Sequence, residues 1–227
     1  MYLSPSGQFC VTEFIDFLTA GQRLQSVDNE QTRKQVFRRA GLWLHALHEY
    51  RPIKPKQYWG NWMPIEIDEI VECGEMMADP ADVAVLRDKL KSQVRKVNKI
   101  KDSHAWSHGD FHSENLMLGP GATYGFDFTE ARRKMAVYDI VDFLKVDIHR
   151  RTPRADLDSA GITKLHREMF FKGYKHPINK EVLDVSIRGR LLIDWISITK
   201  RGFAEREDRR SAFERFKFRI DVAFGRT

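Results

Sequence analysis

The sequence has no run of 18 or more apolar residues, and it has only two cysteines, Cys10 and Cys73. A run of about that length is needed to cross a bilayer, so we expect no membrane-spanning helix and no membrane partner. Two cysteines form neither a disulfide framework nor a zinc motif here, and we expect both to be buried or half-buried packing residues. The first ten residues lack the basic and apolar parts of a secretory signal. The expected location is therefore a reducing cytoplasm.

The sequence also lacks internal repeats, low-complexity segments and an extreme charge. Its 38 lysines and arginines against 32 aspartates and glutamates give a net charge of +6. We interpret this small excess of positive charge as a feature that keeps the protein soluble. The basic and aromatic residues of 199–219 are interleaved with acids, which is typical of a solvated amphipathic helix, so no nucleic-acid partner is expected. The 227 residues suffice for one substantial core or two small lobes.

The spacing of apolar residues predicts an α+β fold that is mainly helical. Residues 8–17 are rich in β-forming residues and predict a strand or hairpin arm. The prolines and aromatics of 51–69 indicate a long ordered loop, and residues 99–107 are too polar and broken to predict a strand. Two short apolar runs, 115–119 and 123–128, predict a β-hairpin. Helical periodicity predicts helices over 30–49, 79–100, 137–150, 156–174, 180–202 and 205–224.

The stretch SHGDFHSENLML, residues 107–118, gathers polar side chains just before the predicted hairpin. One interpretation is a metal-dependent hydrolase, because imidazole and carboxylate groups suit zinc, iron or manganese. Its candidate ligands are His108, Asp110, His112 and Asp127. This interpretation requires an extended strand before the loop, which the sequence does not predict. Another interpretation is a polar loop that only caps the fold.

A third interpretation is the catalytic loop of a phosphotransferase. Asn115 follows Asp110 by five residues, and Asp127 follows the predicted hairpin, as in the loops of kinases. In that chemistry one carboxylate accepts the proton of the attacking hydroxyl. A second carboxylate and the amide oxygen hold Mg²⁺ on the nucleotide phosphates. The combined spacing favours this third interpretation.

The segments HGDFHSENLML, YGFDFTEA and YDIVDF together resemble the aminoglycoside phosphotransferase family, which includes choline kinases. CVTEFIDFLTAGQRL is similar to its hinge and AGLWLHALHEY to one of its helices, so the resemblance covers residues 8–145. It implies the helical C-lobe of a protein-kinase-like fold, ATP and Mg²⁺ as cofactors, and a small-molecule hydroxyl acceptor. The implied site residues are Asp110 as catalytic base, Asn115 and Asp127 for Mg²⁺, His108 as a support of the loop, and the backbone of Glu13, Phe14 and Ile15 for adenine.

The resemblance also assigns a role to Asp139, as a buried carboxylate that ties its helix to the loop, whereas Asp142 is expected at the helix surface or as a cap. The family pattern begins with a glycine-rich loop and a strand lysine, and neither occurs before the hinge-like stretch. We therefore expect residues 1–28 to be the remnant of an N-lobe strand and hinge, and 29–227 to be the helical C-lobe. Four explanations are consistent with the missing N-lobe motifs. They are a truncated product, a mis-started gene, an inactive remnant or pseudokinase-type binding protein, and a site that another chain completes.

The acceptor is less well defined by the sequence. Arginine and lysine outnumber acids after residue 150, so a polycationic acceptor is not favoured. An aromatic cage would suit a quaternary ammonium group, although helical spacing favours core positions for several of these rings. The candidate rings are Tyr58, Trp59, Trp62, Tyr174, Trp195 and Phe203.

Overall fold

The computed structural model describes residues 2–3, 5–6, 10–11, 13–26, 29–128 and 130–226. Its α-helices are α1 (Ala20–Ser26), α2 (Glu30–Glu49), α3 (Trp62–Cys73), α4 (Pro80–Val97), α5 (Ala136–Leu144), α6 (Lys164–Gly173), α7 (Lys180–Ile196), α8 (Lys200–Glu205) and α9 (Glu207–Ala223). Short 3₁₀ helices are η1 (Ser113–Asn115), η2 (Lys145–His149) and η3 (Arg154–Asp156). Its strands are β1 (Tyr2–Leu3), β2 (Cys10–Val11), β3 (Lys54–Gln57), β4 (Lys101–Ser107), β5 (Leu116–Leu118), β6 (Thr123–Gly125) and β7 (Arg132–Met135).

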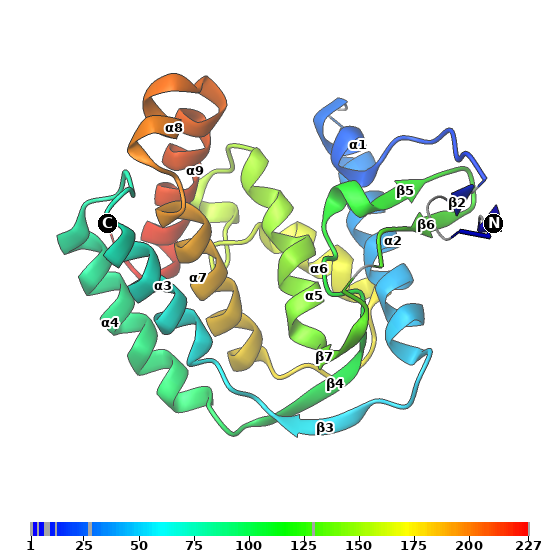
Figure 1. The fold of residues 1–227 in the computed structure, drawn as a ribbon, viewed down its shortest axis with the longest axis horizontal. Helices are drawn as coiled ribbons and strands as arrows, with labels where there is room; N and C mark the ends of the chain where they lie inside the picture. The colour runs from blue at the N-terminus through cyan, green and yellow to red at the C-terminus, as the bar shows by residue number, and fades with distance from the viewer. Residues whose placement is uncertain are drawn as a thin grey trace.

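The strands pair in three small antiparallel sheets, which are β1-β2, β3-β4-β7 and β5-β6. In Figure 1 the sheet β3-β4-β7 runs along one edge of the molecule, below the central helices α5 and α6. Helices α3, α4, α7, α8 and α9 lie on one side, and α1, α2 and the hairpin β5-β6 lie on the other. Strand β4 is central in its sheet and leads directly into residues 108–115, so the sheet determines where this polar loop begins.

The closest helix packing joins α2 to α6. Gly41 of α2 and Gly173 of α6 make it possible: a β-carbon at Gly41 would lie 2.1 Å from the carbonyl oxygen of Phe170, and one at Gly173 would lie 2.3 Å from that of Arg38. Neither distance is tolerable, so only glycine lets the two backbones approach this far. This contact gives α2 a rigid position beside the core.

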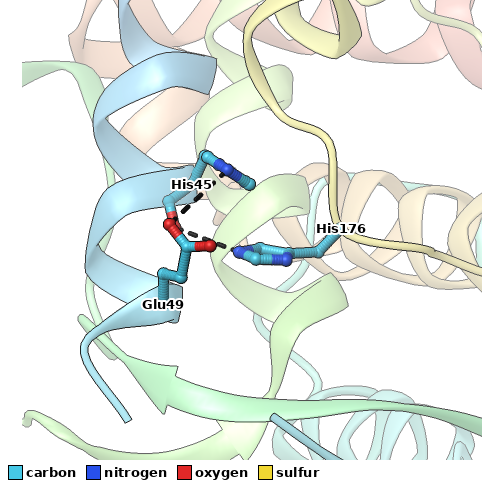
Figure 2. A group of neighbouring side chains, drawn as sticks. All are labelled: His45, Glu49 and His176. Atoms are coloured by element: carbon cyan, nitrogen blue, oxygen red, sulfur yellow. Dashed lines mark hydrogen bonds and ion pairs between the residues drawn. The ribbon is translucent and has the colours of Figure 1, made fainter. Parts of the chain in front are cut away.

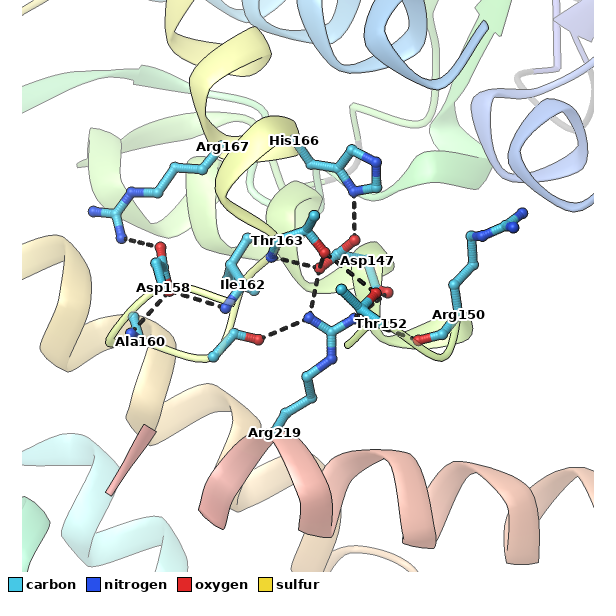
Figure 3. A network of polar contacts seen from close by, with 11 residues as sticks. Asp147, Arg150, Thr152, Asp158, Ala160, Ile162, Thr163, His166, Arg167 and Arg219 are labelled. Atoms are coloured by element: carbon cyan, nitrogen blue, oxygen red, sulfur yellow. Dashed lines mark hydrogen bonds and ion pairs between the residues drawn. The ribbon is translucent and has the colours of Figure 1, made fainter. Parts of the chain in front are cut away.

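A buried polar network around Asp147 connects η2, α6 and α9 (Figure 3). The carboxylate accepts hydrogen bonds from His166 Nδ1 at 2.5 Å, Thr163 Oγ1 at 2.6 Å and an Arg219 guanidinium nitrogen at 2.8 Å. Arg219 is itself only 1% exposed. Burial by itself would raise the pKa of Asp147, but the hydrogen bond from His166 and the charge of Arg219 outweigh it and hold the pKa at about 2.

Several predicted elements are confirmed, and with them the mainly helical α+β fold class. The helix over 30–49 has those bounds, capped by the Asn29 side chain. The helix predicted over 79–100 is α4, which begins with Pro80 behind an Asp79 cap. The predicted hairpin is β5-β6. No helix in the described part of the chain combines the length and apolarity that a membrane crossing needs.

Other predictions were wrong. Residues 51–69 contain β3 and the start of α3 instead of a long loop, because Pro64 sits in the first turn of α3, where a missing N–H costs little. Residues 101–107 form β4, although they were too polar to predict a strand. The helix expected over 156–174 begins only at Lys164, and the one expected over 180–202 is divided into α7 and α8.

The N-terminal strand is shorter than predicted, and Cys73 differs from its expected environment. Strand β2 ends at Val11, and residues 13–18 have no regular structure. Gln8, Phe9 and Thr12 lie outside the described residues, and so does the environment of Cys10. Cys73 is exposed at the C-terminal end of α3, not buried as expected.

Candidate functional site

The polar loop begins where β4 ends. Gly109 has φ of 92°, in the left-handed region, and a β-carbon there would lie 2.5 Å from the carbonyl oxygen of Glu130. Glycine is therefore required between His108 and Asp110, because other residues rarely adopt this backbone angle and because a side chain would collide with Glu130. The tight turn places the Asp110 side chain, which is 52% exposed, at the surface while His108 points into the protein.

Asp139 holds this turn from below, as the resemblance implied. Strand β7 pairs antiparallel with β4, with Met135 opposite His104, and it continues directly into α5, which packs against β4. There the fully buried carboxylate of Asp139 accepts the backbone N–H of His108 at 2.7 Å and that of Gly109 at 3.0 Å. His48 Nε2 of α2 donates to the same carboxylate at 3.0 Å, while Tyr174 Oη donates to His48 Nδ1 at 2.8 Å.

His108 connects the loop to the segment after the hairpin. Its Nε2 donates to the carbonyl oxygen of Phe126 at 2.9 Å, and its ring lies 4.6 Å from that of Phe128. Trp43 of α2 covers the other side, with its ring 5.9 Å from His108 and stacked 5.3 Å from Phe111. A histidine that is fully buried and bonded in this way is positioned as a structural support.

Asp110 and Asn115 are brought together by η1. The buried Asn115 donates its side-chain amide to the backbone carbonyl of Asp110 at 3.0 Å and lies 3.5 Å from the Asp110 carboxylate. His112 caps η1 through Nδ1, which accepts the N–H of Glu114, and its Nε2 lies 3.4 Å from Asp110 Oδ2. Because the amide nitrogen of Asn115 faces Asp110, its oxygen is the atom it can offer to a cation.

Asp127 follows the hairpin at an exposed position. The N–H of Phe126 donates to the carbonyl oxygen of Asn115 at 3.2 Å, which fixes the start of the Asp127 segment against η1. Asp127 has φ of 62°, which is uncommon for a residue other than glycine and is often found at functional sites. No three of His108, Asp110, His112 and Asp127 form a group with ligand atoms close enough to share an ion.

The hinge-like segment lies along the hairpin. Leu18 accepts the N–H of Leu118 at 3.0 Å, and Phe17 stacks on Tyr124 with 6.1 Å between the rings. Residues 13–15, which precede these contacts, have no regular structure, and Phe14 among them is 85% exposed. Glu13, Phe14 and Ile15 therefore lie in an irregular segment and not at the end of a strand.

A cavity of about 370 Å³ opens beside Asp110. Its walls include four carboxylates and two permanent cations, from the loop, α5, η2 and α7: Asp110, Glu114, Asp142, Lys145, Arg190 and Asp194. Asp142 is 3.1 Å from an Arg190 nitrogen and 3.6 Å from Lys145 Nζ, which is also 3.2 Å from Asp194. Burial raises the pKa of Asp142, and the charges of Arg190 and Lys145 oppose that effect.

This charged wall was not predicted from the sequence. Asp142 was expected at the helix surface or as a cap, but its side chain is only 16% exposed and faces Arg190, which lies 48 residues later in the sequence. The spacing of Asp142 and Lys145 on one helical face was the only local signal. The aromatic cage does not form from the expected rings, because Tyr58, Tyr174 and Trp195 are core residues with at most 2% exposure.

The comparisons with known proteins give consistent results. A spectinomycin phosphotransferase in complex with ADP and spectinomycin has a TM-score of 0.56 at 16% identity, with coverage of 93% of this chain and 69% of that one. A glucosamine kinase in complex with glucosamine, ADP and inorganic phosphate gives 0.63 at 15% identity, with coverage of 92% and 58%. A choline/ethanolamine kinase family protein from Mesorhizobium loti gives 0.63 at 14% identity, with coverage of 98% and 71%.

The chain therefore spans between 58% and 71% of the length of these three structures. At such low identity they establish the shared fold, which is the one that the sequence resemblance predicted. The comparison with curated proteins gives no match. The pattern of one family, described as the phosphotransferase enzyme family, matches residues 2–171. Because this match covers well over half of the chain, the protein belongs to the phosphotransferase enzyme family.

Proposed function

We propose that the protein transfers the γ-phosphoryl group of ATP to a hydroxyl group of a polar small molecule, with Asp110 as the catalytic base. The observation that carries this proposal is the Asp110–Asn115 contact on a turn that the buried Asp139 fixes through two backbone hydrogen bonds. Phosphoryl transfer depends mainly on positioning and charge stabilisation, and this turn supplies a positioned carboxylate.

In the proposed reaction Asp110 orients the acceptor hydroxyl and takes its proton. The acceptor oxygen forms a bond to the γ-phosphorus while the bond from that phosphorus to the β–γ bridging oxygen breaks, and ADP leaves. The Asp110 side chain is half-exposed at the mouth of the 370 Å³ cavity, so an acceptor in the cavity would reach it. His112, 3.4 Å away, adds a polar neighbour on the same side.

Asn115 and Asp127 are the residues that would hold Mg²⁺. Both offer hard oxygen ligands, the amide nitrogen of Asn115 is already engaged by Asp110, and the exposed Asp127 directly follows Phe126, which bonds to Asn115, so the donor set fits the ion. When bound, the ion would neutralise charge on the phosphates. Asp139 and His108 would keep the two ligand-bearing segments in register through the bonds described above.

The nucleotide would lie between the loop and the surface segment of Glu13, Phe14 and Ile15, whose backbone would contact adenine. The sequence contains neither a glycine-rich loop nor a strand lysine before this segment. We propose that residues of a preceding N-lobe or of a partner chain cover the phosphates. Without that cover we expect ATP binding to be weak, because the phosphates would contact only one wall of a pocket.

The acceptor would be a hydroxyl-bearing molecule with several hydrogen-bonding groups. The cavity wall offers carboxylates and cations together, which suits a sugar-like or amino-sugar compound better than an apolar one. The buried positions of Tyr58, Tyr174 and Trp195 argue against a quaternary ammonium cage made from them.

The test is nucleotide binding, followed by transfer. We expect ATP with Mg²⁺ to raise the unfolding temperature, and ATP without Mg²⁺ to raise it less. Asp127→Asn should remove the Mg²⁺-dependent part, while Asp110→Asn should keep nucleotide binding and abolish ADP release in the presence of sugars and amino sugars. The exposed Asp88→Asn is the matched control and should change neither measurement. The absence of any ATP effect at millimolar concentration, or an unchanged effect in Asp127→Asn, would contradict the proposal.

A further inference from the structure

Three side chains of α2 and of the segment after α6 form a compact group (Figure 2). His45 and Glu49 lie one turn apart on α2, and His176 follows α6. One possible metal-ligand atom of each residue lies within 4.8 Å of the other two. Among the residues that the structure describes, this is the one group of three or more histidine, cysteine or acidic side chains that could hold a metal ion. His45 Nε2 and Glu49 Oε2 are 3.8 Å apart, and the two imidazole rings are 4.0 Å apart.

Two imidazoles and one carboxylate are a ligand set that zinc uses, with a fourth position left for water. With metal–ligand bonds of about 2.0–2.1 Å, ligand atoms in a tetrahedral site lie roughly 3.3 Å apart. The pair His45–Glu49 already approaches that value. Glu49 is 67% exposed, so its side chain is free to rotate through the remaining distance.

The protein positions the two histidines before any ion arrives. The α2–α6 packing through Gly41 and Gly173 fixes the helix that carries His45 against the helix that precedes His176. His176 Nε2 donates to the carbonyl oxygen of His45 at 3.2 Å, a bond that an ion could replace. His45 Nδ1 is buried without a hydrogen-bond partner among the described residues. The other ring nitrogen, Nε2, faces Glu49 and is the atom that can bind an ion.

A ligand histidine binds a metal through an unprotonated ring nitrogen, and Nε2 of His45 is the nitrogen that faces Glu49. Glu49 supplies the negative charge that a divalent cation requires.

We infer that His45, Glu49 and His176 form a binding site for zinc or a similar divalent transition metal, which links α2 to the segment after α6. The site has a structural consequence. Helix α2 also carries His48, one residue before Glu49, which donates to Asp139 beneath the polar loop. Metal binding would therefore hold the helix that supports the loop, through residues that are not among the proposed phosphotransfer residues.

The experiment uses the whole chain, stripped of metal with a chelator, dialysed and titrated with Zn²⁺ by calorimetry without nucleotide. We expect one Zn²⁺ per chain. Co²⁺ should give visible absorption bands with the intensity of a four- or five-coordinate ion. His176→Ala and Glu49→Gln should each weaken binding at least ~100-fold, beyond the 10–100-fold loss typical of outer-shell changes. His104→Ala removes a half-buried histidine of β4 outside the group and should bind like the wild type.

Circular dichroism and the unfolding temperature of the metal-free variants establish that they are folded, so a loss of binding reports on the ligands. Glu49→Gln changes an exposed side chain and keeps the test valid even if His176→Ala destabilises the chain. Absence of a 1:1 zinc complex, octahedral Co²⁺ spectra, or unchanged affinity in both variants would overturn the inference. Because no nucleotide is present, the result is independent of the phosphotransferase proposal.

Discussion

At the scale of single residues, Asp139 has the largest consequence for the loop. It is fully buried and accepts three hydrogen bonds, from the backbone of His108 and Gly109 and from His48. We expect Asp139→Asn to lower the free energy of unfolding by about 2–4 kcal/mol. The N–H₂ group of the new amide cannot accept a hydrogen bond, so at least one of the donors that Asp139 binds is left buried without an acceptor. Urea denaturation followed by circular dichroism measures this loss.

The surface variant Asp88→Asn is the control for this measurement. Its side chain is 67% exposed beside Arg87, so its removal should change stability by less than about 1 kcal/mol. If the two variants lose similar amounts, Asp139 does not hold the turn. A stable Asp139→Asn protein that has lost Mg²⁺-dependent ATP binding would place the role of Asp139 in the site alone.

Sequence reasoning worked best for residues whose role depends on near neighbours. The spacing from Asp110 to Asn115 is closed by a single 3₁₀ turn, so it carried over into the structure as a contact. Asp142 failed as a prediction because its partner Arg190 belongs to a helix that only the fold brings near. Local pattern cannot show a partner of that kind.

At the scale of elements, the Asp147 network ties η2 to α6 and α9 (Figure 3), and it makes stability depend on pH. The pKa of Asp147 is held at about 2, below its ordinary value of 3.8. A lowered carboxyl pKa stabilises the fold above the ordinary value, and the contribution is lost as the pH falls toward 2. The contribution is about 2 kcal/mol, of which about 1 kcal/mol is lost by pH 3.

The measurement compares urea denaturation at pH 5 and pH 3 in the wild type and in the double variant Asp147→Asn, Arg219→Met. The double substitution avoids leaving a lone charge in the core, which by itself would cost about 3–5 kcal/mol. We expect the wild type to lose about 1 kcal/mol more than the double variant over this interval. Equal losses would mean that Asp147 is not the group responsible.

Strand β4, which sequence reasoning missed, depends on distant partners. Strand β4 reads as polar, yet Asp102 and Ser103 are buried, since Asp102 accepts the N–H of Asn179 and Ser103 donates to the carbonyl of Pro177. Helices such as α2 and α4 were predictable because their caps and apolar faces are local. The start of α3 at Trp62 was hidden by Pro64, which local rules associate with loops.

At the scale of the whole molecule, one apolar core runs through the chain. Ala20 and Leu24 of α1 belong to it, and so does Phe224 after α9. The division at residues 28 and 29 remains a prediction, but the core is shared across it. Trp43 of α2 borders the loop, whereas Trp195 of α7 packs against Phe213 of α9 with 5.3 Å between the rings. These two indoles therefore report on opposite parts of a single core.

We expect one cooperative unfolding transition, because the buried apolar residues of the described part of the chain belong to a single cluster. The test uses two variants that each retain one tryptophan, Trp43 or Trp195, with the other four replaced by phenylalanine. A chelator keeps metal away from the proposed site of His45, Glu49 and His176. Under these conditions, the urea denaturation curves from fluorescence and from circular dichroism should have the same midpoint within each variant. In each variant the midpoint of the fluorescence curve is compared with that of its own circular dichroism curve. A Trp43 midpoint at lower urea, without such a difference for Trp195, would show that the part of the core beside the polar loop unfolds separately. In that case the core around α1 and α2 would need a further partner for its stability.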